Sequence, residues 1–330
     1  MHILVIRFTS LGDIILTTPV VAALRERYPQ AHIDFLVMES CADAIEGNPH
    51  IDRLIRFDKA RQRGLRGLAS FARRLEEYDL VIDLHAKLRS RLLTALMPGR
   101  VLRYRKRSWW KPIGVRLRLM RYHADAPIVT TYFGALAPLG IPTGKETLNF
   151  AYSEADQQRV AEHAGAVVLA IGAANATKKW PATHFSRLGE MIEGPIVIIG
   201  GREDSADGEM IQYRVGSRCT NLAGDLSLKE SGALLAAARY VVCNDSVSFH
   251  MARAVGTPAF VIFGPTDPGM FIFSDRAVLL YRNEPCSPCS LHGDRECPRG
   301  HFNCMLKLKP ETVLDRIAAT PPSSSAEMER

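Results

Sequence analysis

The stretch Tyr240-Val241-Val242-Cys243-Asn244-Asp245-Ser246-Val247-Ser248-Phe249-His250 joins a short apolar run to an acid, a hydroxyl and a histidine. The run Tyr240–Asn244 predicts a buried strand, and the residues after it predict the start of a helix. The first turn of a helix has backbone N–H groups without partners and a positive partial charge, so it suits a phosphate. The sequence therefore predicts an anion-binding turn between a strand and a helix.

A similar turn lies near the other end of the chain. The apolar run Ile3–Ile6 leads into Thr9-Ser10-Leu11-Gly12-Asp13 and then into a helical pattern. Asp13 could cap this helix, or it could act as a general base at the carboxyl end of a parallel strand, where open α/β sheets bind ligands. Two such turns, far apart in the sequence, predict two lobes that face one cleft.

Short apolar runs alternate with helical stretches along the chain, which predicts βαβ units and parallel sheets. The strands expected in the first half are Ile3–Ile6, Ile33–Val37, Arg53–Phe57, Leu80–Asp83 and Arg100–Leu102. Helices are expected near Ile14–Tyr28, Leu65–Glu76 and Ser90–Met97. Pro19 should kink or break the first of these helices.

The alternation restarts after the loop Ile141-Pro142-Thr143-Gly144-Lys145. Ser153–Ala164 looks helical, and Ser227-Leu228-Lys229-Glu230 is a capping box that opens a helix to Ala238. Further strands are expected at Val167–Ile171, Ile196–Ile199, Tyr240–Asn244 and Ala259–Phe263. We expect a first α/β domain over residues 1–150, a second over 151–319, and a disordered tail over 320–330.

Composition restricts the class of protein. The 330 residues, 47% hydrophobic and 23% charged, are typical of a globular protein with two α/β domains. No apolar run reaches the roughly 20 residues of a membrane span, and Ile3–Ile6 is too short for a signal peptide. We therefore expect a cytoplasmic protein whose cysteines are thiols or metal ligands rather than disulfides.

The net charge of +7 is concentrated in one segment, because Leu84–Ala124 contains 12 Lys or Arg and no Asp or Glu. Trp109 and Trp110 lie within it, in Arg105-Lys106-Arg107-Ser108-Trp109-Trp110-Lys111. Basic residues beside tryptophans suit anionic lipid headgroups, and they would also suit nucleic acid. The alternative is a solvated face without a partner.

Two further turns carry polar side chains that suit a nucleotide. In Lys178-Lys179-Trp180-Pro181 a lysine can neutralise phosphate, although a surface lysine pair is an equal alternative. In Gly200-Gly201-Arg202-Glu203-Asp204 an acid such as Glu203 after a strand can hold a ribose, although a helix cap is slightly favoured.

Four cysteines, Cys286, Cys289, Cys297 and Cys304, have the spacing C-x2-C-x7-C-x6-C. Four thiolates could hold a structural zinc, and reduced thiols that pack a loop are the alternative. No set of residues typical of a catalytic metal site accompanies them. The sequence contains no G-x-G-x-x-G, no G-x-x-x-x-G-K-[ST], no G-x-S-x-G and no Asp-x-Asp, which disfavours nicotinamide dehydrogenases, P-loop enzymes and serine hydrolases.

Five motifs in order resemble the ADP-heptose:lipopolysaccharide heptosyltransferases, glycosyltransferase family 9. The motifs are Arg7-Phe8-Thr9-Ser10-Leu11-Gly12-Asp13, Lys178-Lys179-Trp180-Pro181, Asn244-Asp245-Ser246-Val247-Ser248-Phe249-His250, Phe263-Gly264-Pro265-Thr266-Asp267-Pro268 and Cys286-Ser287-Pro288-Cys289. The resemblance implies the GT-B architecture, in which two Rossmann-like domains face a central cleft.

The resemblance also implies roles for single residues. Asp13 matches the family's catalytic base, with Gly12 beside it. Lys178 matches a lysine that contacts the donor, and Asp245, Ser246, Val247 and His250 match the donor site D-[ST]-G-x-x-H. Val247 departs from the family's glycine, and its β-branched side chain crowds the approach to a phosphate and disfavours a positive φ.

The implied activity is an inverting, metal-independent transfer of heptose from ADP-heptose to the inner core of lipopolysaccharide. The implied partners are the donor, the glycolipid acceptor and the inner leaflet of the cytoplasmic membrane, where the enzyme would be peripheral. Another GT-B enzyme that uses a nucleotide sugar, such as one with a different donor or an epimerase, is the first alternative. A nucleic-acid-binding protein is the second, and it would leave the donor motifs without a use.

Overall fold

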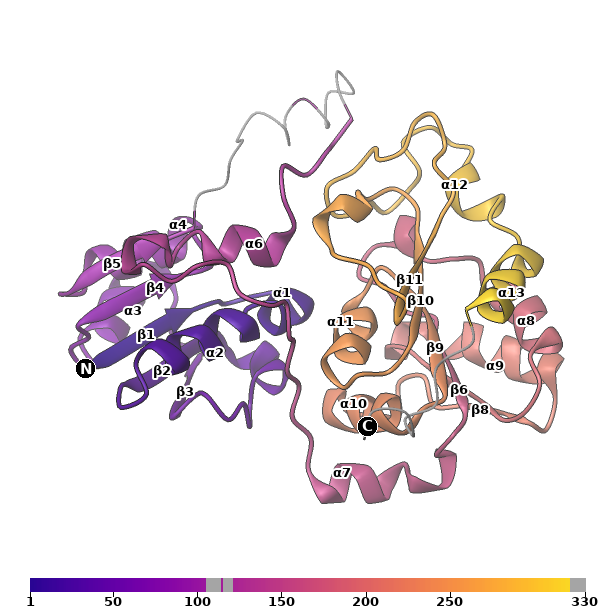
Figure 1. Ribbon diagram of the computed structural model, residues 1–330, viewed down its shortest axis with the longest axis horizontal. Helices are drawn as coiled ribbons and strands as arrows, with labels where there is room; N and C mark the ends of the chain where they lie inside the picture. The colour runs from indigo at the N-terminus through magenta and orange to yellow at the C-terminus, as the bar shows by residue number, and fades with distance from the viewer. Residues whose placement is uncertain (105–113, 115–120, 321–330) are drawn as a thin grey trace. The chain divides into compact units, whose positions relative to one another are not determined.

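The structure is a computed structural model that describes residues 1–104, 114 and 121–320 (Figure 1). Its chain divides into two compact units. Among the described residues, 1–104 and 126–151 form the first unit, and 114, 121–125 and 152–320 form the second. The short segment 121–125 therefore belongs to the second unit although the chain returns to the first unit after it.

The first unit is built on a parallel sheet with the strand order β3-β2-β1-β4-β5. Every pair of neighbouring strands in it is parallel. The strands are β1 (His2–Ile6), β2 (His32–Met38), β3 (Arg53–Phe57), β4 (Leu80–Asp83) and β5 (Arg100–Arg103). The order reverses between β1 and β4, because the chain first builds outward to β3 and then returns to the other side of β1.

Helices connect these strands. They are α1 (Leu11–Ile15), α2 (Thr18–Arg27), α3 (Gly64–Ala72), α4 (Leu88–Ala95) and α6 (Ile128–Phe133), with the 3₁₀ turns η1 (Glu39–Ala44) and η2 (Ala137–Leu139). Pro19 lies in the first turn of α2, where its missing N–H costs no hydrogen bond. The predicted break near Pro19 is therefore confirmed, because α1 ends at Ile15 and α2 begins anew at Thr18.

The second unit contains a six-stranded parallel sheet with the order β11-β10-β9-β6-β7-β8. Its strands are β6 (Val167–Ala170), β7 (Ile196–Ile199), β8 (Cys219–Asn221), β9 (Tyr240–Asn244), β10 (Ala259–Phe263) and β11 (Ala277–Tyr281). The order reverses between β6 and β9. Both sheets thus follow the doubly wound pattern, with one switch point each.

The helices of the second unit pack around this sheet (Figure 1). They are α7 (Glu154–Arg159), α8 (Ala182–Met191), α9 (Ser205–Val215), α10 (Leu228–Ala237), α11 (Val247–Ala254), α12 (Asn303–Leu306) and α13 (Pro310–Ala319). Short 3₁₀ turns are η3 (Ala161–His163), η4 (Ala176–Lys178), η5 (Arg202–Asp204) and η6 (Pro268–Met270). The predicted capping box of α10 is confirmed, since Ser227 Oγ accepts from the Glu230 N–H at 3.1 Å.

The predicted α/β fold with two parallel-sheet domains is confirmed, and so are the strand positions named above. Two strands were not predicted: β8, which has three residues, and β11, which follows an irregular stretch. Both are edge strands, and they complete a sheet whose central strands are fully buried. The predicted tail, apart from residue 320, lies outside the described residues.

Candidate functional site

The first candidate site lies at the switch point of the first sheet, where β1 and β4 are neighbours. Arg7 follows β1 directly, and it is almost fully buried. Its Nη1 donates to the Leu84 carbonyl oxygen at 2.6 Å, and its Nε donates to the Thr9 carbonyl oxygen at 2.7 Å. Arg7 thereby joins the end of β4 to the loop that precedes α1.

Asp13 is held by the same arginine. Arg7 Nη2 lies 2.7 Å from Asp13 Oδ2, and the hydroxyl and N–H of Ser10 donate to that oxygen at 3.0 and 3.3 Å. The other oxygen, Oδ1, accepts from the Tyr132 hydroxyl at 3.3 Å. The Asp13 side chain is 28% exposed, and Oδ2 is held by more donors than Oδ1.

Burial raises the pKa of Asp13, but the charge of Arg7 and the hydrogen bonds from Ser10 outweigh it, so the pKa lies below the ordinary value. Burial raises the pKa of Tyr132 well above its ordinary value, so this phenol remains a donor. Tyr104 packs edge-on against Tyr132, with ring centroids 5.2 Å apart. Asp13 is therefore an ionised carboxylate at neutral pH, in a fixed orientation.

The second candidate site lies at the switch point of the second sheet, between β6 and β9. Lys178 comes from the loop after β6 and Asp245 from the loop after β9, and Lys178 Nζ lies 2.8 Å from Asp245 Oδ2. The Thr266 hydroxyl, after β10, donates to the same oxygen at 2.7 Å. The structure thus brings two predicted donor-site residues, 67 positions apart, into direct contact; ligands bind at such switch points in open α/β sheets.

Helix α11 starts two residues after Asp245. Ser246 is its N-cap, and the Ser246 Oγ atom is shielded from solvent without a hydrogen-bond partner among the described residues. Val247 is the first helical residue, so the position where the family has glycine needs no positive φ here. His250 is buried one turn later, with its ring centroid 5.1 Å from Phe249 and 5.0 Å from Phe271.

Asn244 fixes the lysine loop to the end of β9. Its Oδ1 accepts from the Trp180 N–H at 2.9 Å, and its Nδ2 donates to the Ile171 carbonyl oxygen at 2.8 Å. The Trp180 ring is buried, and its Nε1 donates to the Leu308 carbonyl oxygen at 3.0 Å. A fully buried amide thus sets the position of the loop that carries Lys178.

The neighbouring Lys179 has a different partner. It forms an ion pair with Asp204, which is buried and also accepts from the Gly201 N–H at 2.8 Å. Glu203, which the sequence predicted as a ribose ligand, is exposed in η5, and its role stays a prediction. A Cβ at Gly172 would lie 2.7 Å from Asp204 Oδ2, so the glycine after β6 makes room for this acid.

The cysteine-containing loop packs on the lysine loop. The Thr177 N–H donates to the Asp294 carbonyl oxygen at 3.1 Å, and the Asp294 N–H donates to Thr177 Oγ1 at 2.7 Å. Asn175 Nδ2 donates to the His292 carbonyl oxygen at 2.8 Å. These bonds fix residues 292–294 against residues 175–177, directly before Lys178.

Gly293 sits at the centre of this contact. It has φ +81°, and a Cβ there would lie 2.7 Å from Lys178 Cγ and 2.9 Å from Lys178 Cδ. Real Cβ atoms do not approach carbon so closely, so only glycine leaves room for the lysine side chain as it stands. Gly293 therefore helps to position Lys178.

The four cysteines of the predicted zinc site are free thiols. Burial, with the nearby Cys286 and Cys297, raises the pKa of Cys289 to about 11, and burial with the other three thiols raises the pKa of Cys304 to about 12. Across residues 1–104, 114 and 121–320, no group of three or more His, Cys, Asp or Glu side chains is arranged to hold a metal ion. The zinc prediction stays untested.

The basic stretch Arg105–Lys111 with its two tryptophans lies outside the described residues. Just after it, the Ala124 N–H donates to Asp267 Oδ2 at 2.6 Å, which fixes residues 121–125 to the loop after β10. No helix in the described part of the chain is long and apolar enough to cross a bilayer.

Comparisons with known proteins identify the family of this chain. Residues 68–298 match the family described as glycosyltransferase family 9 (heptosyltransferase). This chain belongs to glycosyltransferase family 9. The family 9 member described here is 28% identical to lipopolysaccharide heptosyltransferase 3 of Escherichia coli, over 78% of this chain and 81% of the relative. It is 27% identical to lipooligosaccharide heptosyltransferase 2 of Haemophilus influenzae, over 96% and 98% of the two chains.

Solved structures show the same fold. A family 9 glycosyltransferase from Veillonella parvula has a TM-score of 0.80 at 22% identity, covering 97% of this chain and 96% of that one. The E. coli heptosyltransferase WaaC with ADP-2-deoxy-2-fluoro heptose has a TM-score of 0.70 at 19% identity, covering 97% and 99%. The predicted GT-B type of fold and the assignment as a glycosyltransferase are thus confirmed.

Sequence reasoning missed several side chains that shape these sites. They are Arg7, Tyr132, Lys179, Asp204, Asn244 and Thr266. Most of these residues lie inside the sequence motifs named above, next to the predicted site residues. Tyr132 gave no signal, because 119 residues separate it from Asp13 and the contact depends on the fold.

Proposed function

We propose that this family 9 glycosyltransferase transfers heptose from ADP-heptose to the inner core of lipopolysaccharide, with inversion at the anomeric carbon. Family membership supports sugar transfer, and the names of the relatives support heptose and lipopolysaccharide. The observation that carries the proposal is the placement of the predicted groups. Asp13 and the pair Lys178–Asp245 each occupy the switch point of a doubly wound sheet.

The second unit would hold the donor. Lys178, the Ser246 hydroxyl and the first N–H groups of α11 converge at one sheet edge, and together they can bind the diphosphate. The Ser246 Oγ atom lacks a partner in the described structure, and a phosphate oxygen would supply one. As the bond from the anomeric carbon to the phosphate oxygen breaks, its electron pair stays on ADP, and these groups stabilise the new negative charge.

Asp13 in the first unit would act as the general base. An acceptor hydroxyl attacks the anomeric carbon, a new C–O bond forms, and the proton passes to Asp13 Oδ1 while Arg7 and Ser10 hold Oδ2. A carboxylate of lowered pKa is a weak base, so the proton moves late, when bond formation has made the hydroxyl acidic. The reaction requires Asp13 to reach the sugar that the second unit holds.

Asp13 supplies the negative charge that accepts the proton, and Lys178 supplies the positive charge that stabilises the departing ADP. The proposed chemistry therefore uses no metal ion. Zinc at Cys286, Cys289, Cys297 and Cys304 would be structural, because the chain between Cys289 and Cys297 is bonded at Asp294 to Thr177, next to Lys178. We further propose that the enzyme acts in the cytoplasm at the inner face of the cytoplasmic membrane, where a lipid-linked acceptor is available. Nucleic acid has no part in this proposal.

Mass spectrometry of the reaction product tests the proposal. The protein is incubated with heptose-deficient lipopolysaccharide and ADP-heptose, with ADP-glucose, UDP-glucose and UDP-N-acetylglucosamine in parallel. The expected result is a mass increase of one heptose with ADP-heptose alone. Transfer of another sugar would replace the donor assignment, and a nucleotide sugar altered without transfer would indicate an epimerase instead.

A further inference from the structure

Two leucines at the start of neighbouring helices in the first unit are unusually exposed. Leu65, in the first turn of α3, is 70% exposed, and Leu88, the first residue of α4, is 73% exposed. One exposed leucine is ordinary on a protein surface. Two at the same edge of one sheet call for an explanation, since neither takes part in the hydrophobic core of its own helix.

The fold places these two helix starts at the same edge. Both helices follow parallel strands, so both begin at the carboxyl edge of the sheet, and right-handed crossovers to β4 and β5 put them on the same face. Leu68 and Phe71 of α3 share one core cluster with Leu93 of α4. Arg89 Cζ lies 5.7 Å from the Phe57 ring centroid, so the first turn of α4 contacts the end of β3.

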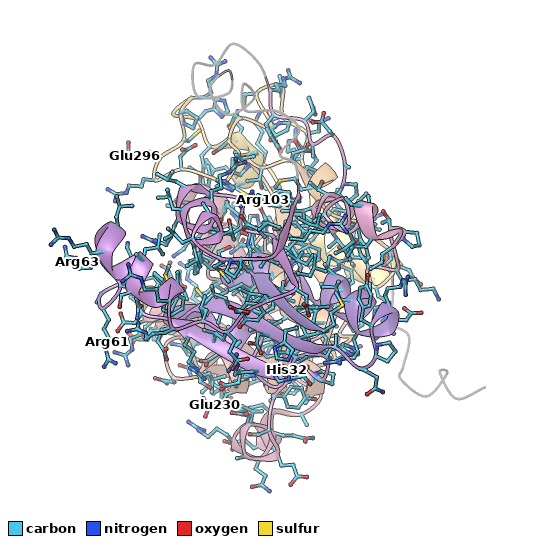
Figure 2. The ribbon with its side chains drawn as sticks, turned by 90° about the vertical axis from the view of Figure 1, so that its left-hand side faces the viewer. His32, Arg61, Arg63, Arg103, Glu230 and Glu296 are labelled. Atoms are coloured by element: carbon cyan, nitrogen blue, oxygen red, sulfur yellow. The ribbon has the colours of Figure 1, made fainter. Side chains whose placement is uncertain are left out.

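Basic residues flank the two leucines in the sequence. Residues 59–75 contain six Lys or Arg and residues 84–104 contain five, and neither stretch contains Asp or Glu. Arg61 forms an ion pair with Asp58, with Nε and Oδ2 3.2 Å apart. Arg63, Arg66 and Lys87 are exposed, and none has a carboxylate within ion-pairing distance in the described ranges. Figure 2 shows Arg61 and Arg63 at the rim of the first unit, with Arg63 pointing outward.

We propose that Leu65 and Leu88, with Arg63, Arg66 and Lys87 around them, form a surface that docks the first unit on an anionic lipid bilayer. Exposed leucines can enter the region between headgroups and acyl chains, while arginine and lysine stay at the level of the lipid phosphates. A phosphate on a soluble ligand would explain the cations but not the leucines. This surface thus combines apolar and basic side chains, which match the acyl chains and the anionic headgroups of a bilayer.

This inference deepens the proposed function, because a membrane-bound acceptor gives a reason for the enzyme to sit on a bilayer. The surface lies at the carboxyl edge of the sheet that also carries Asp13. Docking through this edge would therefore turn the base of the first unit toward the lipid.

Vesicle cosedimentation with the full chain tests the surface directly. Vesicles of phosphatidylethanolamine and phosphatidylglycerol are compared with vesicles of phosphatidylcholine alone. The double variant Leu65→Gln/Leu88→Gln should bind the anionic vesicles about tenfold more weakly than the unchanged protein, and Arg63→Glu/Arg66→Glu at least as much more weakly. Leu96→Gln is the matched control, because Leu96 is 55% exposed at the opposite end of α4.

Equal binding by Leu65→Gln/Leu88→Gln and the unchanged protein would overturn the inference, and so would an equal loss in Leu96→Gln. Transfer to a delipidated, water-soluble core oligosaccharide provides the second readout. Its kcat/KM should be the same in the leucine variant, and a parallel loss would assign the surface to acceptor binding instead. Failure of the proposed function appears separately, as an unchanged protein that binds vesicles but transfers no heptose.

Discussion

Gly293→Ala is a sensitive test of how Lys178 is positioned. The added Cβ would lie 2.7 Å from Lys178 Cγ and 2.9 Å from Cδ, whereas carbon atoms prefer separations of about 3.5–4.0 Å. The clash therefore amounts to about 1 Å. Residues 292 and 294 cannot simply withdraw, because hydrogen bonds of 2.7, 2.8 and 3.1 Å hold them to residues 175 and 177.

The lysine side chain must then shift, and its Nζ moves away from its position 2.8 Å from Asp245 Oδ2. A misplacement of about 1 Å can cost about 100-fold in rate, so kcat/KM for ADP-heptose should fall between tenfold and 100-fold. This corresponds to about 1.4–2.7 kcal/mol of transition-state stabilisation. Steady-state kinetics over a range of ADP-heptose concentrations measure the loss.

Gly300→Ala is the matched control. Gly300 lies in the same loop with φ +74°, but a Cβ there meets nothing within 4 Å. In both variants an alanine must adopt the left-handed conformation, which costs roughly 1–2 kcal/mol. A difference in kcat/KM between Gly293→Ala and Gly300→Ala therefore reports the contact with Lys178. In a Lys178→Ala background, which removes Cγ and Cδ, Gly293→Ala should cost much less further activity, because only the 3.1 Å approach to Asn175 Cβ remains. Equal kcat/KM in Gly293→Ala and Gly300→Ala would refute the reasoning.

Three further predictions follow from the same contacts. Asn244→Ala removes the Trp180 and Ile171 hydrogen bonds, and it should lower the free energy of unfolding by about 2–4 kcal/mol and weaken ADP binding. Urea unfolding measures the stability and calorimetry measures the ADP affinity, with the exposed Asn283→Ala as the reference. Unchanged ADP affinity in Asn244→Ala would show that Asn244 does not position the lysine loop. The folded pKa of Asp13 is lowered, so its contribution to stability is full above about pH 5 and disappears as the pH falls through that pKa. The stability difference between the unchanged protein and Asp13→Asn should stay constant from pH 8 to about 5 and shrink only below about pH 4. A difference that stays constant below about pH 4, or that grows as the pH falls from about 7 to 5, would show that the pKa is not lowered. The transfer rate should be the same in EDTA and in Mg²⁺, and an absolute need for a divalent ion would contradict the metal-independent chemistry, whatever zinc analysis finds at the cysteines.

Much of the fold could be predicted because its strands are continuous apolar runs. Val167–Ala170 and Ile196–Ile199 are buried along their whole length, as parallel strands covered on both faces must be. Cys219–Asn221 could not be predicted in this way, because a three-residue edge strand with two polar residues has no periodicity to detect.

In the candidate sites, too, some residues could be predicted from the sequence, whereas their contacts could not. Lys178 and Asp245 could be chosen from their motifs because each follows a predicted strand, and parallel strands end at one sheet edge. That they contact each other depends on β6 and β9 being neighbours, which is a property of the strand order. Tyr132 reaches Asp13 from α6, and Gly293 reaches Lys178 from an irregular loop, so neither contact follows from local sequence.

The role of Asp13 is the central claim, and the turnover number of Asp13→Asn tests it most directly. The change keeps the size of the side chain and removes the proton acceptor, with exposed Asp43→Asn in the same unit as the matched control. Loss of a general base should lower kcat by about 10²- to 10⁴-fold, while calorimetry shows the same ADP affinity as the unchanged protein. A kcat for Asp13→Asn within a few-fold of that of Asp43→Asn would contradict the account.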